Sequence, residues 1–241
     1  VMEWIDEPRL DTLLRRTGRS EERTQLLAAA GNWLRHFHDH SGFAVQPLAS
    51  RQVPRNIDVM LGGEDGAGMK VGDRVFRSAY STLVRCADAF AGTPIPHVTA
   101  YEDFAPKNLL HGRGGTVGID IGGRSTLPVT SDIFHFLVQA EMKKPRLSRA
   151  SFGIAGHDGQ ALLKAYGATD HLRDDRLMAF FYLAAATMQW ARRIYRVRRR
   201  GVSLERVIHL LQARRVAQQA VSALQAGGGN DDAQAEMSRR S

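Results

Sequence analysis

The sequence contains only one cysteine, Cys86, and this scarcity excludes an internal disulfide framework. A lone cysteine is typical of proteins in a reducing compartment. Long apolar runs are missing as well, because the longest candidate, residues 177–190, contains Gln189 and is shorter than the roughly 18 apolar residues that a membrane-spanning helix needs. No basic region precedes an apolar stretch at the N-terminus, so we expect no secretory signal. These absences together predict a cytoplasmic protein.

Lysine is also scarce, because only five of the 33 basic side chains are lysine and the rest are arginine. The formal net charge of +8 can attract nucleic acid, anionic lipid or phosphorylated substrates. A preference for arginine on solvated faces explains the same balance without any partner. No recognisable nucleic-acid-binding module accompanies the charge, so we expect no nucleic-acid partner. Peripheral contact with anionic lipid stays open.

Apolar residues make up 43% of the chain and recur mostly at helical spacing. The period predicts helices over residues 10–16, from Ser20 as N-cap through Phe37, over 75–90, from Ser131 as N-cap onward, and over about 158–167, 174–200 and 203–225. Short strands are expected at 98–100, 109–110 and 117–119, and the last two form a hairpin. The predicted fold class is therefore α+β and mostly helical, with one small β-hairpin.

Two segments interrupt the helical pattern. Residues 41–72 contain Pro47, Pro54 and a glycine-dense stretch at 62–68, so we interpret them as an extended connection with short elements and a surface loop. Three consecutive glycines at 227–229 open a polar segment, and residues 226–241 are predicted to be a disordered tail.

An acid–amide–acid pattern carries the clearest chemical information. Asp103-Phe-Ala-Pro-Lys-Asn108 is predicted to lie on a loop before the hairpin, and Asp120 follows the second hairpin strand. Phosphoryl transfer from ATP needs a carboxylate that orients the attacking hydroxyl and accepts its proton. It also needs oxygen ligands that hold Mg²⁺ against the nucleotide phosphates. Asp103 suits the first role, and Asn108 and Asp120 suit the second.

These residues lie in segments that resemble the catalytic lobe of the aminoglycoside phosphotransferase and choline kinase-like family, a branch of the protein-kinase-like fold. The family has a His-Gly-Asp-Phe-x-Pro-x-Asn-Leu/Ile-Leu stretch, then Ile-Asp-Phe/Trp, then Asp-Leu-Ala at a helix start. The matching segments here are residues 103–110, 119–121 and 132–134. Residues 33–38 are similar to the family's Leu-x-x-Leu-His helix and residues 2–5 to its hinge strand. The combination is specific although each piece alone is weak.

The resemblance implies a role for each matching residue. Asp103 would be the catalytic base, Asn108 and Asp120 would bind Mg²⁺, and Lys107 would stabilise charge on the moving phosphate. Asp132 would brace the catalytic loop by accepting hydrogen bonds. The adenine of ATP would meet the backbone of Glu3, Trp4 and Ile5.

The resemblance also implies how the chain is organised. Residues 1–225 would form the catalytic lobe, starting at the hinge, and the N-terminal lobe would be absent. No glycine-rich phosphate loop and no strand lysine precede Val1. We therefore expect a truncated chain that is inactive by itself.

Two positions depart from the family pattern. Tyr101-Glu102 stand where the family has His-Gly, and Gly122-Gly123 follow Asp120 where the family often has an acid or an aromatic residue. Tyrosine can fill the packing position of the histidine, whereas Glu102 adds a β-carbon and a charge. The glycine pair predicts a flexible metal-binding loop. These changes keep a degenerate, non-catalytic kinase open as an alternative.

Other polar residues could serve either function or structure. His36, His38 and His40 lack an accompanying metal-ligand pattern, so zinc is not expected and His38 is interpreted as a packed histidine. Asp6 and Asp11 could contact a polyhydroxyl or cationic substrate, but we favour helix capping.

Charged residues beyond position 150 bear on the acceptor. The acids that could line an acceptor site are Asp158, Asp170, Asp174 and Asp175. Many arginines share this region, which favours a neutral or anionic acceptor over a polycationic aminoglycoside. The arginines that crowd the end of one predicted helix are Arg192, Arg193, Arg196, Arg199 and Arg200. Cations at a helix C-terminus stabilise it by about 0.3–1 kcal/mol each, and docking on an anionic surface is the functional alternative.

The predicted function is ATP-dependent transfer of the γ-phosphoryl group to a hydroxyl of a small molecule, such as a sugar, an amino alcohol or an antibiotic-like acceptor. The first alternative is a kinase-like protein that binds nucleotide without catalysis. The second is a basic module that docks on an anionic partner.

Overall fold

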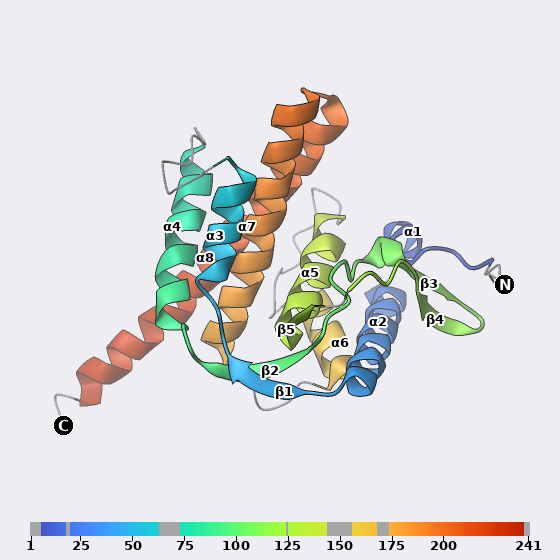
Figure 1. Cartoon of the computed structure of the whole chain (residues 1–241), viewed down its shortest axis with the longest axis horizontal. Coiled ribbons are helices and arrows are strands. Elements are labelled where there is room, and N and C mark those ends of the chain that lie inside the picture. The colour runs from blue at the N-terminus through green and yellow to red at the C-terminus, as the bar shows by residue number, and fades with distance from the viewer. Residues whose placement is uncertain are drawn as a thin grey trace. The chain divides into compact units, whose positions relative to one another are not determined.

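The computed structural model describes residues 6–17, 20–62, 73–123, 125–143, 156–167 and 174–238. The chain is mostly helical and contains two small β-sheets, so the predicted α+β fold class is confirmed (Figure 1). It divides into two compact units, each built from two separate stretches of sequence. Unit 1 comprises Val1–Gln46 and Ile95–Asp170, and unit 2 comprises Pro47–Pro94 and His171–Ser241.

Unit 1 contains the hairpin and most of the larger sheet. Its helices are α1 (Leu10–Arg16), α2 (Ser20–Ser41), the short 3-10 helix η1 (Pro106–Asn108), α5 (Val129–Met142) and α6 (His157–Tyr166). The larger sheet has the order β1–β2–β5, where β1 is Ala44–Pro47, β2 is Pro94–Thr99, and β5 (Thr126–Pro128) is antiparallel to β2. The hairpin pairs β3 (Leu109–Gly112) with β4 (Gly115–Gly118). This is the hairpin that the sequence predicts.

Helices α2 and α6 pack closely against each other in unit 1. Gly31 allows the close approach, because a β-carbon there would lie 2.4 Å from the carbonyl oxygen of Leu162. Leu27, Leu34 and Leu162 are fully buried on these two helices. Removing such leucine side chains from water is a main source of free energy for folding.

A buried ion pair also joins α6 to α2. The Asp158 side chain is only 3% exposed, and its Oδ2 lies 2.7 Å from Nη2 of Arg23. The Nε of Arg23 donates to Oδ1 of the same carboxylate at 3.0 Å, and Nη1 donates to the carbonyl oxygen of Leu14 at 3.0 Å. The carboxylate and the α1 carbonyl are therefore both satisfied by one guanidinium. Asp158 is a structural residue, and the interpretation that it lines an acceptor site is wrong.

The described part of unit 2 is helical. Its helices are α3 (Gln52–Met60), α4 (Arg74–Ala89), α7 (Asp175–Arg200) and α8 (Leu204–Ser238). Helix α7 packs against the other three, and its Trp190 meets Phe76 of α4 edge to face with ring centroids 5.0 Å apart. Asp73 and Asp174 cap α4 and α7, because each carboxylate accepts hydrogen bonds from two backbone N–H groups. No helix in the described ranges is long and apolar enough to span a membrane.

The helix starts differ locally from the predictions. Helix α5 begins at Val129 with Pro128 at its N-cap, so Ser131 lies inside the first turn and is not the cap. Residues 41–72 contain helix α3, one of the short elements expected there, although Pro54 did not suggest a regular helix. This proline occupies the first turn of α3, where a missing N–H costs no helical hydrogen bond.

The N-terminal acids do not cap a helix. The N-cap of α1 is Arg9 and its side chain makes no capping hydrogen bond, so the capping role predicted for Asp6 and Asp11 is wrong. Asp11 lies in the first turn of α1 instead, 3.2 Å from Nη2 of Arg15. An acid in the first helical turn still interacts favourably with the helix dipole.

The C-terminal segment has helical backbone in the structure. Helix α8 continues through Ser238 and therefore covers most of residues 226–241. Its disorder in solution stays a prediction, as does the boundary at residue 225.

Replacing Asp158 with alanine should strongly destabilise unit 1. The change leaves the guanidinium of Arg23 buried without its carboxylate, and breaking a buried pair in this way typically costs about 3–5 kcal/mol. Asp39→Ala is the matched control, since it removes the exposed Arg35–Asp39 pair on α2, which should be worth less than about 1 kcal/mol. Urea unfolding followed by circular dichroism measures both changes. Equal losses in the two variants would contradict the structural role of Asp158.

Candidate active site

The loop that follows β2 is held by a carboxylate from α5. Asp132 is 2% exposed, and its Oδ2 accepts a hydrogen bond from the backbone N–H of Tyr101 at 2.7 Å. Its Oδ1 accepts from the backbone N–H of Glu102 at 3.1 Å. Asp132 therefore braces this loop, as the sequence predicts.

A buried histidine supports Asp132 from the other side. Nε2 of His38 lies 3.2 Å from Oδ2 of Asp132, and Nδ1 lies 3.0 Å from the Tyr166 hydroxyl of α6. His38 is fully buried, so it is packed as predicted. His36 and His40 instead contact each other edge to face, with ring centroids 4.3 Å apart. The network links α2, α5 and α6 behind the loop.

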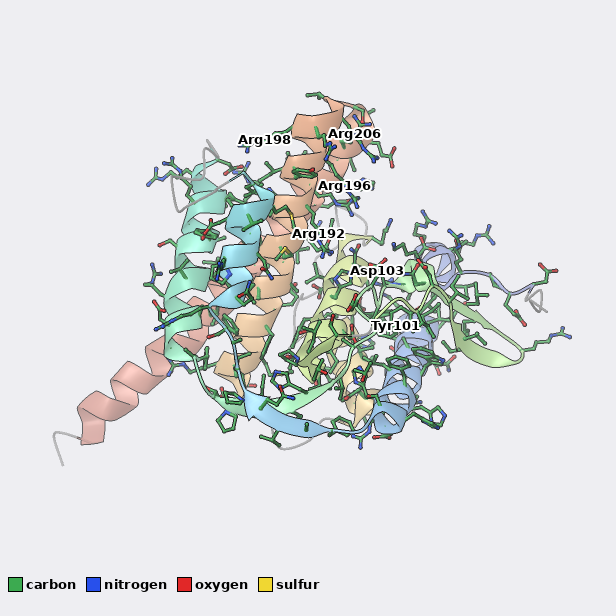
Figure 2. All side chains as sticks on the ribbon, in the orientation of Figure 1. Tyr101, Asp103, Arg192, Arg196, Arg198 and Arg206 are labelled. Carbon is green, nitrogen blue, oxygen red and sulfur yellow. The ribbon has the colours of Figure 1, made fainter. Side chains whose placement is uncertain are left out.

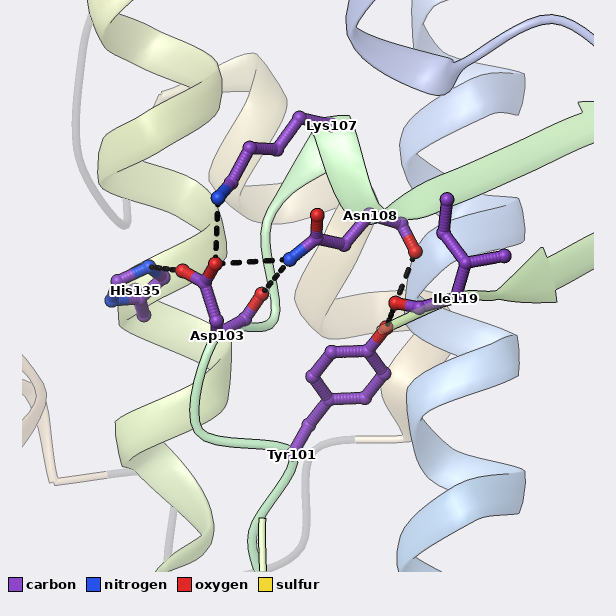
Figure 3. Close-up of polar contacts among 6 residues, drawn as sticks. All are labelled: Tyr101, Asp103, Lys107, Asn108, Ile119 and His135. Carbon is purple, nitrogen blue, oxygen red and sulfur yellow. Dashed lines mark hydrogen bonds and ion pairs between the residues drawn. The ribbon is translucent and has the colours of Figure 1, made fainter. Parts of the chain in front are cut away.

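Tyr101 makes hydrogen bonds that connect the loop to the base of the hairpin. Its ring is fully buried, and its hydroxyl donates to the backbone carbonyl oxygens of Ile119 and Asn108, the latter at 3.2 Å (Figure 3). Burial, followed by the negative charges of Asp120, Asp103 and Asp132, raises the pKa of the Tyr101 hydroxyl. The hydroxyl therefore stays protonated and keeps donating at neutral pH. Tyr101 thus ties the loop to the hairpin through its own hydrogen bonds.

Aromatic rings hold the loop from α2 and α5. Phe104 stacks on Trp33 of α2 with ring centroids 5.9 Å apart, and on Phe136 of α5 at 4.9 Å. Tyr101 meets Trp33 edge to face at 5.7 Å. Stacked and edge-to-face pairs add about 0.5–1.5 kcal/mol each beyond their buried area. Tyr101 and Phe104 are therefore fixed in the core on either side of the Glu102–Asp103 pair, while the Asp103 side chain is 43% exposed.

Three nitrogen-bearing side chains surround the Asp103 carboxylate (Figure 3). Nζ of Lys107 lies 2.7 Å from Oδ2, and Nδ2 of Asn108 donates to the same oxygen at 3.0 Å. Nε2 of His135 lies 3.2 Å from Oδ1. His135, then Lys107 and Asn108, hold the pKa of Asp103 well below its usual range against the opposing effect of burial. Asp103 is therefore a carboxylate throughout the neutral range.

His135 is a site residue that sequence reasoning missed. It lies on α5 three residues after Asp132, so both side chains project from the same face of the helix. Because Asp132 contacts the loop, the spacing of three residues also places residue 135 on the helix face that is turned toward the loop. The family motif extends only to the start of the helix and contains no signal for it.

Asn108 and Asp120 lie at the same end of the hairpin. The backbone N–H of Ile119 donates to the carbonyl oxygen of Asn108 at 2.9 Å and extends the register of β3 and β4 by one pair. Asp120 comes next, exposed and with a φ of 61°. The amide of Asn108 also donates to the backbone carbonyl oxygen of Asp103 at 2.8 Å, which orients it. Asn108 therefore contacts Asp103, and Asp120 follows at the same end of the hairpin.

The donor set suits a hard cation. An amide oxygen and a carboxylate are ligands that Mg²⁺ accepts, and Mg²⁺ usually takes one or two carboxylates and completes its octahedron with water and phosphate oxygens. In the ranges described above, no cluster of three or more His, Cys, Asp or Glu side chains forms a ready metal cage. Asn108 and Asp120 therefore fit a cation that brings its own phosphates, and the Mg²⁺ assignment stays a prediction.

Glu102 stands in a strained turn directly before Asp103. Its φ is 71°, and the N–H of Asp103 donates to the carbonyl oxygen of Tyr101 at 3.0 Å, so the three residues form a γ-turn. Left-handed backbone costs a residue with a β-carbon roughly 1–2 kcal/mol. Among the described residues, Glu102 and Asp120 are the non-glycine positions with positive φ, and both border Asp103 or the predicted metal site. Such strain clusters at functional sites.

The glycine pair after Asp120 has a packing reason. A β-carbon at Gly123 would lie 1.9 Å from the carbonyl oxygen of Ala100, whereas nothing lies close to Gly122. The neighbouring Ser125 N–H donates to Oε1 of Glu102 at 3.2 Å. The expectation of a flexible loop is therefore corrected at Gly123, which brings two backbone segments together.

The remaining predicted site residues have mixed outcomes. Lys107 is 55% exposed beside Asp103, and Asp174 serves as a helix cap. Asp175 is exposed in the first turn of α7. The residues that lie outside the described ranges are Glu3, Trp4, Ile5 and Asp170.

Replacing Glu102 with glycine should raise the free energy of unfolding by about 1 kcal/mol, because glycine adopts positive φ without a steric penalty. Glu102→Ala is the matched control, since it removes the same carboxylate but keeps the β-carbon, and it should give no gain. Chemical denaturation of both variants measures the difference. A gain in the alanine variant equal to that in the glycine variant would place the cost in the carboxylate and not in the turn.

Comparison with known proteins gives relatives by structure alone. No protein-family model and no curated protein sequence matches the chain. A glucosamine kinase structure aligns with 92% of this chain and 59% of its own chain, at a TM-score of 0.56 and 17% identity. A glucosamine kinase complex with glucosamine, ADP and inorganic phosphate gives the same TM-score and identity. The structure of LicA in complex with AMP aligns with 92% of this chain and 68% of its own, at a TM-score of 0.54 and 14% identity.

These similarities concern the fold. The chain spans about three fifths of the length of the glucosamine kinases that it matches. Its fold is that of a kinase-like lobe, mostly helical with small sheets.

Proposed function

We propose that this chain is the catalytic lobe of an ATP-dependent phosphotransferase of the aminoglycoside phosphotransferase and choline kinase-like type. The reaction moves the γ-phosphoryl group of ATP to a hydroxyl of a small molecule. The observation that supports it most is the Asp103 carboxylate, kept ionised by His135, Lys107 and Asn108 on a loop that Asp132 braces. Two oxygen-donor side chains, Asn108 and Asp120, lie at the hairpin end that follows.

Asp103 orients the acceptor hydroxyl in this proposal. A carboxylate with a depressed pKa is a weak base, so it takes the proton late, as the new bond forms. The acceptor oxygen bonds to the γ-phosphorus while the bond from that phosphorus to the oxygen of ADP breaks, and the hydroxyl proton passes to Asp103. His135 and Asn108 hold the carboxylate in place, which limits the reorganisation that the reaction requires.

Lys107 and the two oxygen donors handle negative charge. Bound Mg²⁺, held by Asn108 and Asp120, would neutralise charge on the nucleotide phosphates. Lys107 contacts Asp103 through an exposed ammonium, so it can turn toward the transferring phosphoryl group without leaving a buried charge behind. Each group is placed by the loop or hairpin backbone, and that backbone is tied by Tyr101.

Nucleotide binding is supported by the neighbours in structure. One similar glucosamine kinase was solved with ADP and one similar protein, LicA, with AMP. The backbone of Glu3, Trp4 and Ile5 remains our proposal for the adenine contact. The acceptor is proposed to be a sugar or amino alcohol with a free hydroxyl.

A nucleotide-binding protein without catalysis is the second candidate. Glu102 favours it, because this residue places a β-carbon and a charge in a strained turn next to Asp103. In this case the same loop and hairpin bind nucleotide, but no phosphoryl group is transferred.

Asp103→Asn should lower the turnover of ATP with its acceptor by about 10²–10⁴-fold, because the amide cannot accept the hydroxyl proton. ATP binding should be retained, since Asp103 faces the acceptor in the proposal. Asp39→Asn is the matched control, because Asp39 is also about half-exposed and also forms an (i, i+4) ion pair on the surface of unit 1. The assay compares ADP release and nucleotide binding across a panel of sugars and amino alcohols, for this chain and for the full product of its gene. Unchanged turnover in Asp103→Asn would contradict the proposal, and ATP binding without turnover in the unsubstituted protein would favour the second candidate.

Asp120→Asn should raise the Mg²⁺ concentration needed for half-maximal ATP binding by about tenfold or more, because it removes one charged ligand of the cation. Asp88→Asn on α4 is the control, as Asp88 is an exposed acid of unit 2 paired only with Arg51 in the contacts described. Titration of MgCl₂ at fixed ATP gives the half-maximal concentration for each variant. Equal Mg²⁺ dependence in all three proteins would exclude Asp120 as a ligand.

A further inference from the structure

The second half of α7 has an unusually high density of arginine. Six arginines and no acidic residue lie between positions 192 and 200. Figure 2 labels Arg192, Arg196 and Arg198 along this part of the helix. The helix dipole favours cations only within the last turn, so it does not account for Arg192 and Arg193, two turns before the end. Arg192 and Arg196, and again Arg196 and Arg200, are like charges at (i, i+4), which destabilise a helix by about 0.2–0.5 kcal/mol each.

These arginines line a hollow on unit 2. Arg192, Arg196, Arg199 and Arg200, together with Tyr195 and with Met60 at the end of α3, enclose about 450 Å³. The α7 residues follow helical spacing, so they belong to one face of the helix. We call this feature the arginine hollow. Its volume suits a small anion with several phosphate groups.

The side chains of the arginine hollow are partly positioned in advance. Nη1 of Arg199 donates to the Tyr195 hydroxyl at 2.6 Å, and its guanidinium lies 5.9 Å from the centre of the Tyr195 ring. The carbonyl oxygens of Arg200 and Gly201 at the helix end accept from Nη1 of Arg206, at 2.5 and 2.8 Å. The guanidinium of Arg206 therefore serves the C-terminus of α7, and the arginines of the hollow are not needed for that purpose.

Two arginines of the hollow, Arg196 and Arg200, carry positive charge without an acidic partner in the part of the chain that the structure describes. Burial, followed by the neighbouring charges of Arg196 and Arg192, lowers the pKa of Arg193. Glu205 is the acid that opposes this effect, and its side chain is 82% exposed. An anion in the hollow would relieve this crowding.

We propose that the arginine hollow binds a phosphate-bearing anion. Guanidinium groups present paired N–H donors that match phosphate oxygens, and charge-assisted hydrogen bonds of this kind are the strong ones. The site does not depend on the proposed phosphotransferase reaction, because it uses only residues of unit 2.

Binding of sodium tripolyphosphate to the full chain, measured by isothermal titration calorimetry at low ionic strength, tests the proposal. The double variant Arg196→Gln/Arg200→Gln should weaken binding by at least about tenfold, since it removes two charge-assisted contacts. The matched control is Arg74→Gln/Arg77→Gln, which removes the same net charge from exposed positions of α4 in the same unit. The control should change binding less than about twofold.

A second arm separates free phosphate from lipid headgroups, with vesicles of phosphatidylglycerol and of phosphatidylcholine. Binding to phosphatidylglycerol vesicles that tripolyphosphate displaces, and that only Arg196→Gln/Arg200→Gln loses, would support the hollow with a headgroup as its ligand. Tripolyphosphate binding without vesicle binding would support the hollow with a soluble ligand.

Two results would overturn the proposal. One is the absence of tripolyphosphate binding to the unsubstituted chain at millimolar concentration. The other is equal weakening by the two double variants, which would reduce the effect to net charge. Both pairs are exposed, and thermal unfolding without phosphate should be unchanged or slightly higher for Arg196→Gln/Arg200→Gln because its like-charge pair is gone. If Arg196→Gln/Arg200→Gln does not unfold cooperatively, Arg196→Lys/Arg200→Lys replaces it. The lysine pair keeps the charge and removes the guanidinium geometry, so tripolyphosphate binding as tight as that of the unsubstituted chain would also overturn the proposal.

Discussion

The arrangement of the candidate site depends on one carboxylate, that of Asp132. It is almost fully buried, yet it accepts hydrogen bonds from two consecutive backbone N–H groups, at Tyr101 and Glu102. A buried carboxylate is tolerated only when its charge is compensated, and the N–H dipoles together with His38 provide that compensation. Because Asp132 lies in the first turn of α5, it also benefits from the helix dipole. The loop, the helix and the histidine therefore stabilise one another.

This anchoring allows the next residues to be exposed and charged without becoming mobile. The ring of Phe104 is stacked between Trp33 and Phe136, and the hydroxyl of Tyr101 holds two carbonyl oxygens of the hairpin base. Asp103 and the exposed Glu102 are then presented to solvent between two buried rings, those of Tyr101 and Phe104. Lys107 and Asn108 on η1 and His135 on α5 lower the pKa of the Asp103 carboxyl group, so this group remains ionised.

The periodicity of the sequence predicted the hairpin and the long helices, because these depend on local spacing, and the family resemblance implied that Asp132 braces the loop. The catalytic role of Asp103 stays a prediction. The contacts of His135 and the double hydrogen bond of Tyr101 were not predicted, since both depend on how α5 and the hairpin meet the loop in space. Helix α3 was expected only as an unspecified short element, because proline usually interrupts a helix and only the place of Pro54 in the first turn makes it compatible with one. Asp158 could not be recognised as structural from the sequence, because its burial against Arg23 depends on the packing of α6 on α2.

The alternation of the chain between units 1 and 2 has a consequence for folding. The pairs that close unit 1, Arg23 with Asp158 and His38 with Tyr166, join residues separated by more than a hundred positions, and the intervening stretch 47–94 belongs to unit 2. During synthesis the apolar face of α2 therefore stays exposed until α6, its packing partner, has been synthesised. Such non-local closure slows folding and exposes apolar surface to aggregation. A fragment cut anywhere between the two stretches of unit 1 would leave α2 without its partner helix, so neither unit can be obtained as a single contiguous piece of the chain.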